Sequence, residues 1–144
     1  MTANVEEETI KALIERRTQA VRDKDVDALM TDVDPAALSF DVVGPLRFAG
    51  ADDVRARARG WFASFDSTIE LETRELKIEA NGKVAFYHCL NRIRGALAGG
   101  NKVDMWVRST VCLRKENEKW MITHQHTSVP FDATTGKAAL DLKP

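Results

Sequence analysis

The sequence predicts an α+β fold in which three N-terminal helices pack against a curved, mixed but mainly antiparallel sheet. Apolar residues recur with helical spacing in most of the first 65 residues, whereas residues 68–129 alternate as strands do. Turn signals at Asn81-Gly82, 98–101 and 116–118 separate the long strands. Helices that precede a strand meander are typical of this class. A strongly bent sheet of this kind forms a cone, and we expect a ligand pocket between the sheet and the helices.

The helices follow from apolar spacing and from their end signals. The first runs from Val5 to about Val21, with Glu6, Glu7 and Glu8 near its positive end. A short second helix fits 26–30, with Asp25 as its N-cap and Pro35 ending the segment. The third spans 51–65 and continues its apolar stripe through Gly60.

The strands follow from alternation and from turns. Residues 38–43 predict a short strand, which Gly44-Pro45 turns back into 46–48. A long strand over 68–80 shifts its phase at Glu75-Leu76, which predicts a bulge. The remaining strands are predicted at 83–97, 102–115 and 119–129.

The length and the charge of the chain limit the class of protein to which it can belong. The 144 residues predict one domain, 1–144, with a core over about 5–131 and a C-terminal tail, 132–144, of little pattern. Lys and Arg total 21 against 22 Asp and Glu, which argues against a nucleic-acid partner. No run of 18 apolar residues predicts a membrane span, and no export signal is evident. We therefore expect a cytoplasmic protein with Cys89 and Cys112 reduced.

The last predicted strand holds the most informative polar residues. Strict alternation would place Trp120, Ile122, His124, His126 and Ser128 on one face. Two histidines two residues apart could bind a metal, but a zinc site needs three or four ligands. We therefore expect no metal and no cofactor. The simpler interpretation places one histidine in the core and the other in the cavity.

The chain resembles the SnoaL-like and ketosteroid-isomerase-like proteins of the nuclear transport factor 2-like superfamily. The resemblance covers about residues 5–131 and rests on the order of elements and on W-x-I-x-H-x-H-x-S-x-P at 120–130. Further matches are the segments 24–29, 50–54 and 108–110. The final strand also resembles the association domain of calcium/calmodulin-dependent kinase II. The resemblance implies a cone-shaped, cystatin-like α+β barrel, an apolar pocket and a homodimer formed through the outer sheet face.

The resemblance does not extend to all the catalytic groups of the ketosteroid isomerases. Asp41 matches their general base, in a similar Asp-x-x-Gly segment. Arg17 stands where they have a tyrosine of the oxyanion hole, and 109–111 contains no acid for the second donor. The only tyrosine, Tyr87, lies on another strand. True ketosteroid isomerase activity is therefore not expected.

A looser acid/base site remains as a hypothesis. Asp41 would pair across the cavity with His124 or His126, which titrate near neutral pH. Arg108 would hold an anionic or carbonyl oxygen. The remaining candidates would line the cavity: Trp61, Phe65, Phe86, His88, Trp106 and Ser128.

Each candidate also has a structural alternative. Trp61 and Phe65 have the helical spacing of core residues. Arg108 could instead pair with Glu72 or Asp104, and Asp41 could simply end its strand.

Two functions stay open at this stage. The first is a pocket for a small, mostly apolar, carbonyl-type molecule, with cofactor-free isomerase, lyase or cyclase chemistry as its enzymatic form. The second is a non-catalytic ligand-binding or oligomerisation module. The face on which His124 and His126 lie discriminates between them, because an outer position favours the second.

Overall fold

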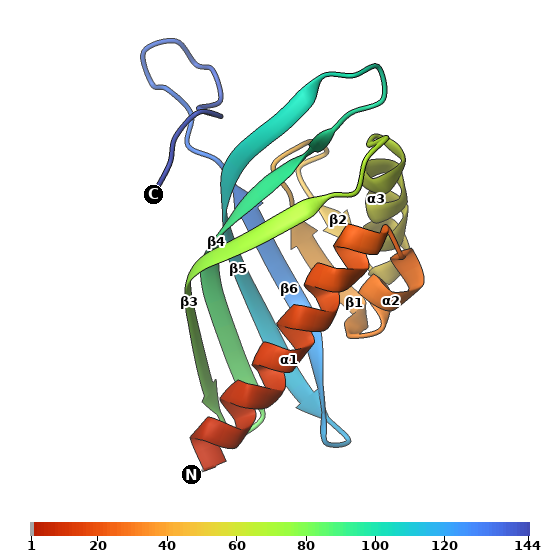
Figure 1. The fold of residues 1–144 in the computed structure, drawn as a ribbon. Coiled ribbons are helices and arrows are strands. Elements are labelled where there is room, and N and C mark those ends of the chain that lie inside the picture. The colour runs from red at the N-terminus through yellow and green to blue at the C-terminus, as the bar shows by residue number, and fades with distance from the viewer. Residues whose placement is uncertain (1) are drawn as a thin grey trace.

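The computed structural model describes residues 2–144, with side chains from Val5 onward. Met1, which belongs to the predicted domain, lies outside the described residues. Three helices and six strands follow one another in the predicted order (Figure 1). They are α1 (Thr2–Asp23), α2 (Val26–Met30), β1 (Val33–Phe40), β2 (Phe48–Ala49), α3 (Ala51–Ala63), β3 (Glu70–Asn81), β4 (Val84–Ala96), β5 (Lys102–Glu116) and β6 (Lys119–Ser128).

One mixed sheet contains all the strands, in the spatial order β2-β1-β6-β5-β4-β3. Every neighbouring pair is antiparallel except β1 and β6, which run parallel. The long strands curve around α1, which lies across their concave face, while α2 and α3 lie near one end of α1 (Figure 1). The structure confirms the predicted α+β class and the mixed, mainly antiparallel sheet.

The core consists of three apolar clusters between helices and sheet. One joins Ile10 and Leu13 of α1 to Trp120 and Ile122 of β6. A second surrounds Phe62 and Phe65 at the end of α3, and a third lies under α2 and β1. Burial of these apolar side chains is the main force that holds the helices on the sheet.

Hydrogen bonds to Glu6 connect the start of α1 to the sheet. Its carboxylate accepts hydrogen bonds from Lys115 Nζ at 2.7 Å and from Trp120 Nε1 at 2.5 Å. The hydrogen bond from Lys115 lowers the pKa of Glu6. Since α1 begins at Thr2, three residues earlier than predicted, Glu6 acts through these two partners rather than through the first turn of the helix.

The first strand differs from the prediction in its bounds. β1 spans Val33–Phe40 instead of 38–43, and its antiparallel partner β2 covers only Phe48–Ala49. Pro35 therefore lies inside β1, in a stretch where the register against β6 shifts between Val33 and Leu38. Proline is tolerated there because, in this irregular stretch, its backbone nitrogen does not have to donate a hydrogen bond to the neighbouring strand. Asp41 follows the strand instead of lying within it.

Two bulges interrupt the long strands. The predicted one is confirmed, because Arg74 pairs with Leu90 and the next partner pair is Lys77 with His88. A second bulge in β6 was not predicted. Cys112 faces His124, but the adjacent Leu113 faces Ile122, so Thr123 is an extra residue on β6. An inserted residue exchanges the two faces of a strand beyond it.

The chain after β6 is more ordered than its sequence pattern suggests. It extends away from the sheet (Figure 1) and turns back on itself. The turn is closed by hydrogen bonds from Asp132 N to Lys137 O at 2.7 Å and from Ala139 N to Pro130 O at 2.8 Å. Across the described residues, no helix is both long and apolar enough to cross a membrane.

Two glycines provide a matched test of the packing. A Cβ on Gly95 would lie 2.8 Å from the ring of Phe65, whereas a Cβ on Gly60 in α3 would meet nothing within 4 Å. Gly95→Ala should destabilise the fold by about 1–3 kcal/mol through overpacking. Gly60→Ala should stabilise it by about 0.5–1 kcal/mol, because alanine is the better helix former. Urea unfolding measures both, and equal midpoints for the two variants would contradict the packing described.

Candidate functional site

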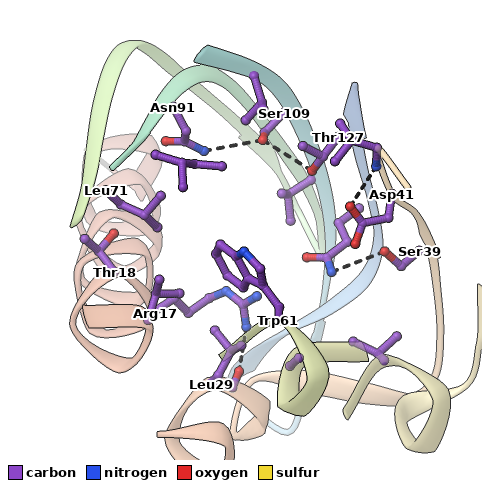
Figure 2. Close-up of a pocket in the computed structure, with 18 of the residues that line it drawn as sticks. Arg17, Thr18, Leu29, Ser39, Asp41, Trp61, Leu71, Asn91, Ser109 and Thr127 are labelled. Carbon is purple, nitrogen blue, oxygen red and sulfur yellow. Dashed lines mark hydrogen bonds between the residues drawn. The ribbon is translucent and has the colours of Figure 1, made fainter. Parts of the chain in front are cut away.

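A cavity of about 210 Å³ lies between the helices and the concave face of the sheet (Figure 2). Its lining comes from all three helices and from all six strands of the described chain. Much of the wall is apolar, and that part includes Ile14, Val21, Leu29, Val54, Trp61, Leu71, Ile93 and Val107. Such a wall favours a ligand with an apolar body.

A strip of polar side chains crosses the sheet side of the cavity. Thr73 Oγ1 donates to Asn91 Oδ1 at 2.8 Å, and Asn91 Nδ2 donates to Ser109 Oγ at 3.3 Å. Ser109 and Thr127 hydroxyls are 3.5 Å apart (Figure 2). The strip takes one residue from each of four adjacent strands, so the sheet register holds it in place. Hydroxyl and amide groups of this kind can orient an oxygen of a bound molecule.

Asp41 and Arg57 form an ion pair in the cavity lining. Arg57 Nε donates to Asp41 Oδ2 at 3.0 Å, and the backbone N–H of Val42 donates to Oδ1 at 2.7 Å. Both carboxylate oxygens of Asp41 therefore already accept a hydrogen bond. A ligand could transfer a proton to Oδ2 only if it shared this oxygen with Arg57 or displaced Arg57 from it.

Arg17 and Tyr87 also line the cavity, from α1 and β4. Arg17 Nη1 donates to the carbonyl oxygen of Leu29 at 2.6 Å. Burial lowers the pKa of Arg17, and burial raises the pKa of Tyr87 to about 12. Arginine stays protonated nevertheless, so the pair is a cation beside a neutral phenol at physiological pH. The two groups are close enough for their charges to affect each other.

His124 and His126 lie on the outer face of the sheet, not in the cavity. His124 Nδ1 is 2.7 Å from Leu38 O, and its ring packs 4.8 Å from that of Phe40. His126 lies 5.5 Å from the same ring. The expected pairing of either histidine with Asp41 across the cavity is wrong, because the bulge at Thr123 reverses the faces of β6. Trp120 and Ile122 point into the core, whereas Gln125 and Thr127 line the cavity.

The other predicted site residues on the strands share this outer face. Arg108 donates to Ser128 Oγ at 3.2 Å, and Trp106 lies under the guanidinium of Arg74 at 5.3 Å. Phe86 stacks with His88 at 6.3 Å. None of them is among the residues that line the cavity. Alternation puts them outward because Tyr87, Val107 and Thr127, their neighbours in the chain, point inward.

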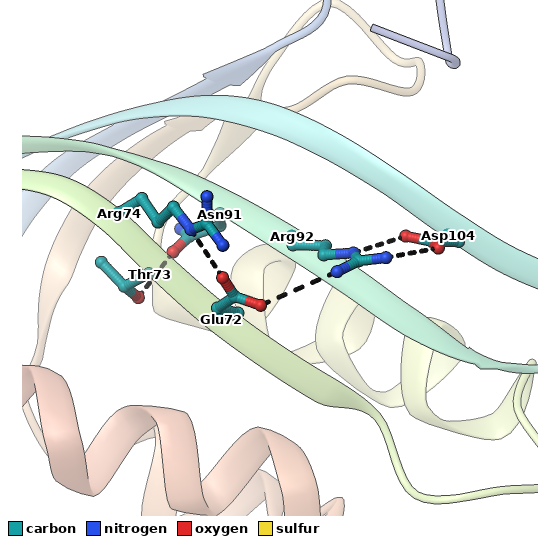
Figure 3. A network of polar contacts seen from close by, with 6 residues as sticks. All are labelled: Glu72, Thr73, Arg74, Asn91, Arg92 and Asp104. Carbon is teal, nitrogen blue, oxygen red and sulfur yellow. Dashed lines mark hydrogen bonds and ion pairs between the residues drawn. The ribbon is translucent and has the colours of Figure 1, made fainter. Parts of the chain in front are cut away.

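The structure also shows which of the remaining candidates have the structural role considered for them. Phe65 is buried against Gly95 in the core and does not line the cavity, whereas Trp61 does. The acids proposed as partners of Arg108 pair instead with Arg92, whose Nε is 2.8 Å from Asp104 (Figure 3). Arg92 also lies 3.8 Å from Glu72 (Figure 3). Asp41 and Trp61 are thus the predicted site residues that the cavity contains.

Sequence reasoning missed most of the polar lining. Arg57, Asn91, Ser109, Gln125 and Thr127 all face the cavity. For the four that lie on β4 to β6, the signal is strand alternation, which can be followed once the bulge in β6 is placed; Arg57 lies on α3 and has no such signal. In the described part of the chain, no group of three His, Cys, Asp or Glu side chains is arranged to hold a metal ion.

Comparison with known proteins assigns the family. Residues 10–132 match the model of the SnoaL-like domain, and the chain belongs to this family. It is 31% identical to an NTF2-like protein of unknown function from Pseudomonas putida, covering 99% of both chains with a TM-score of 0.90. Among curated proteins, none matches significantly.

More distant structures share the fold. A candidate dehydratase of the NTF2-like family from Streptomyces avermitilis is 18% identical, with 88% and 97% of the two chains covered and a TM-score of 0.76. A candidate calcium/calmodulin-dependent protein kinase II association domain from Xanthomonas campestris is 15% identical, with 83% and 84% covered and a TM-score of 0.73. The names of these proteins span both enzymatic and assembly functions.

The cavity environment of Cys89 is testable by thiol chemistry. Burial raises the pKa of Cys89 to about 11, so about one thiol in a thousand is ionised at pH 8. In Cys112→Ser, which leaves Cys89 as the sole thiol, labelling by a disulfide reagent should be slow at pH 8. It should rise about tenfold per pH unit up to pH 10. Labelling of native Cys89 at pH 8 as fast as in urea would contradict this burial; Cys89→Ser serves as the control.

Proposed function

We propose that this SnoaL-like domain binds a small, mostly apolar molecule with a carbonyl-type oxygen in its cavity. The observation that supports this most directly is the polar strip of Thr73, Asn91, Ser109 and Thr127, which lies opposite apolar side chains such as Trp61 and Leu29 of the helices. An apolar wall stabilises the body of a ligand, and a few placed polar groups fix its orientation.

The volume of the cavity limits the size of the ligand. An apolar cavity of about 150 Å³ holds benzene. The cavity here has about 210 Å³, which suits one ring with a short side chain, or about ten non-hydrogen atoms.

Catalysis in this cavity would depend on Asp41, the one carboxylate in its described lining. An isomerase or lyase reaction needs a base within hydrogen-bond reach of the substrate proton. Asp41 is in place for this role, but Arg57 and the backbone of Val42 occupy its oxygens. The second acid/base group expected from the sequence is absent from the cavity, since both histidines lie outside it. Ligand binding is therefore the function that the geometry supports best, and cofactor-free acid/base chemistry is its enzymatic form.

The ligand-binding proposal is tested by one change made on each face of β5. Ser109 points into the cavity, whereas its neighbour Thr110 is exposed on the outer face. Ser109→Phe should fill the cavity and weaken binding of acetophenone or phenylacetamide at least tenfold. Thr110→Phe should leave the affinity within twofold. Titration calorimetry measures both, with unfolding curves to show that each variant folds. Equal affinities in the two variants would place the ligand elsewhere.

The outer face supports a second candidate function, assembly with another copy of the chain. His124 and His126 lie there with Phe40, Trp106 and Phe86, and Phe86 is 39% exposed. The charged groups beside them are already paired on the same face, as Arg92 with Asp104 and Glu72 (Figure 3). Burying a paired charge in an interface costs less free energy than burying an unpaired one. This arrangement is compatible with a homodimer in which the same face of each copy is buried.

The assembly proposal predicts a dimer of twice the chain mass of 16.1 kDa in light scattering. Phe86→Asp combined with His126→Asp should shift the protein to monomers, because both exposed side chains would carry a charge into the interface. Phe131→Asp is the control, since Phe131 is also exposed but belongs to the tail. A wild-type protein that stays monomeric at tens of micromolar would rule out a stable dimer.

A further inference from the structure

Arg17 is a partly buried cation for which the described residues provide no anion. Its hydrogen-bond partner is an uncharged group, the Leu29 carbonyl oxygen at 2.6 Å. No described carboxylate lies within ion-pair distance of it. Asp32, the acid whose charge affects it, pairs with Arg16 at 3.6 Å instead. The other arginine of the cavity lining, Arg57, already has Asp41 as its partner.

The remaining donors of Arg17 open into the cavity. A guanidinium has five N–H donors, and one hydrogen bond leaves most of them available. No described side-chain nitrogen or oxygen is both fully buried and without a partner. The nitrogens of Arg17 that lack a partner therefore have access to the cavity. The hydroxyl of Tyr87 is open to the cavity by the same argument. Figure 2 shows Arg17 reaching from α1 into the cavity toward Trp61.

A carboxylate would complete this arrangement. A planar guanidinium matches a carboxylate in a two-pronged hydrogen bond, and a neutral phenol can add a third donor. Partial burial of Arg17, which lowers its pKa, is unfavourable without a counter-ion. An anionic ligand would offset that cost, whereas a neutral ligand of the same shape would not.

We propose that the cavity binds a small organic carboxylate, with its carboxylate on Arg17 and Tyr87 and its apolar body against Trp61, Leu71 and Ile93. This inference rests on the proposed ligand-binding function and names the chemical class of its ligand. Arg17 also braces α1 against α2 through the Leu29 carbonyl. A purely bracing role would affect stability but would not distinguish an acid from its amide.

The test uses two compounds that differ in charge but not in shape, phenylacetate and phenylacetamide. Each has ten non-hydrogen atoms, the size expected for a cavity of about 210 Å³. The wild-type protein should bind phenylacetate at least about tenfold more tightly, because a charge-assisted pair is stronger than a neutral hydrogen bond. In Arg17→Gln the two affinities should become equal to within about twofold. In Arg114→Gln, which removes an exposed arginine of β5, the preference should persist.

Two further variants keep the proposal falsifiable if Arg17→Gln fails to fold. Arg17→Lys retains the charge and should keep part of the preference for the acid. Arg57→Gln combined with Asp41→Asn removes the other charged pair of the cavity without leaving an unpaired charge, and it should change both affinities by a similar factor. In the wild-type protein, phenylacetate should also shift the side-chain Nε–H resonance of Arg17, identified by its loss in Arg17→Lys.

The outcomes separate this inference from the proposed function. If both compounds bind the wild type equally, the cavity takes ligands but the carboxylate anchor is wrong. The same conclusion follows if the preference survives in Arg17→Gln or is lost in the double variant Arg57→Gln, Asp41→Asn. If neither compound binds at millimolar concentration, both proposals fail.

Discussion

The extra residue at Thr123 decides what each face of the final strand does. Before it in the chain, Trp120 and Ile122 close the core, and Trp120 Nε1 donates a hydrogen bond to Glu6 of α1. After it, Gln125 and Thr127 face the cavity, whereas His124 and His126 face outward. Because side chains alternate along a strand, one inserted residue is enough to exchange the two sets. Without it, two imidazoles would occupy the cavity wall in place of an amide and a hydroxyl.

The polar groups of the cavity differ in how completely their neighbours satisfy them. The strip from Thr73 to Thr127 is connected by its own hydrogen bonds, and Asp41 is held by Arg57 and by the Val42 backbone. Arg17 has a single carbonyl partner. Polar groups inside a protein usually find partners within the fold, so we expect a ligand to gain most from the donors of Arg17 that have no partner. In the proposed complex with a carboxylate, specificity for charge would therefore depend on Arg17, and fit to the apolar body would depend on other residues.

Local patterns predicted the elements well and the site poorly. Helical spacing placed 26–30 as a helix, and the phase shift at Glu75 placed a bulge, since both depend on neighbours in the chain. The bulge at Thr123 left no such mark, because Trp120, Ile122, His124 and His126 alternate without a break in sequence. In the sequence, Asn91, Ser109 and Thr127 are ordinary polar positions, and only the register across three strands brings them together. β1 was misplaced because its partner is β6, about 90 residues away in the chain and parallel to it.

The two faces of the sheet can serve two functions without interfering. Adjacent residues of β5 point to opposite sides, so Ser109 belongs to the cavity and Arg108 and Thr110 belong to the outer face. A second copy packed on that outer face would leave the lining of the cavity unchanged. It would also rigidify the curved strands that hold the polar strip in register. Ligand binding and assembly are therefore compatible in one molecule, and substitutions on either face can assign them separately.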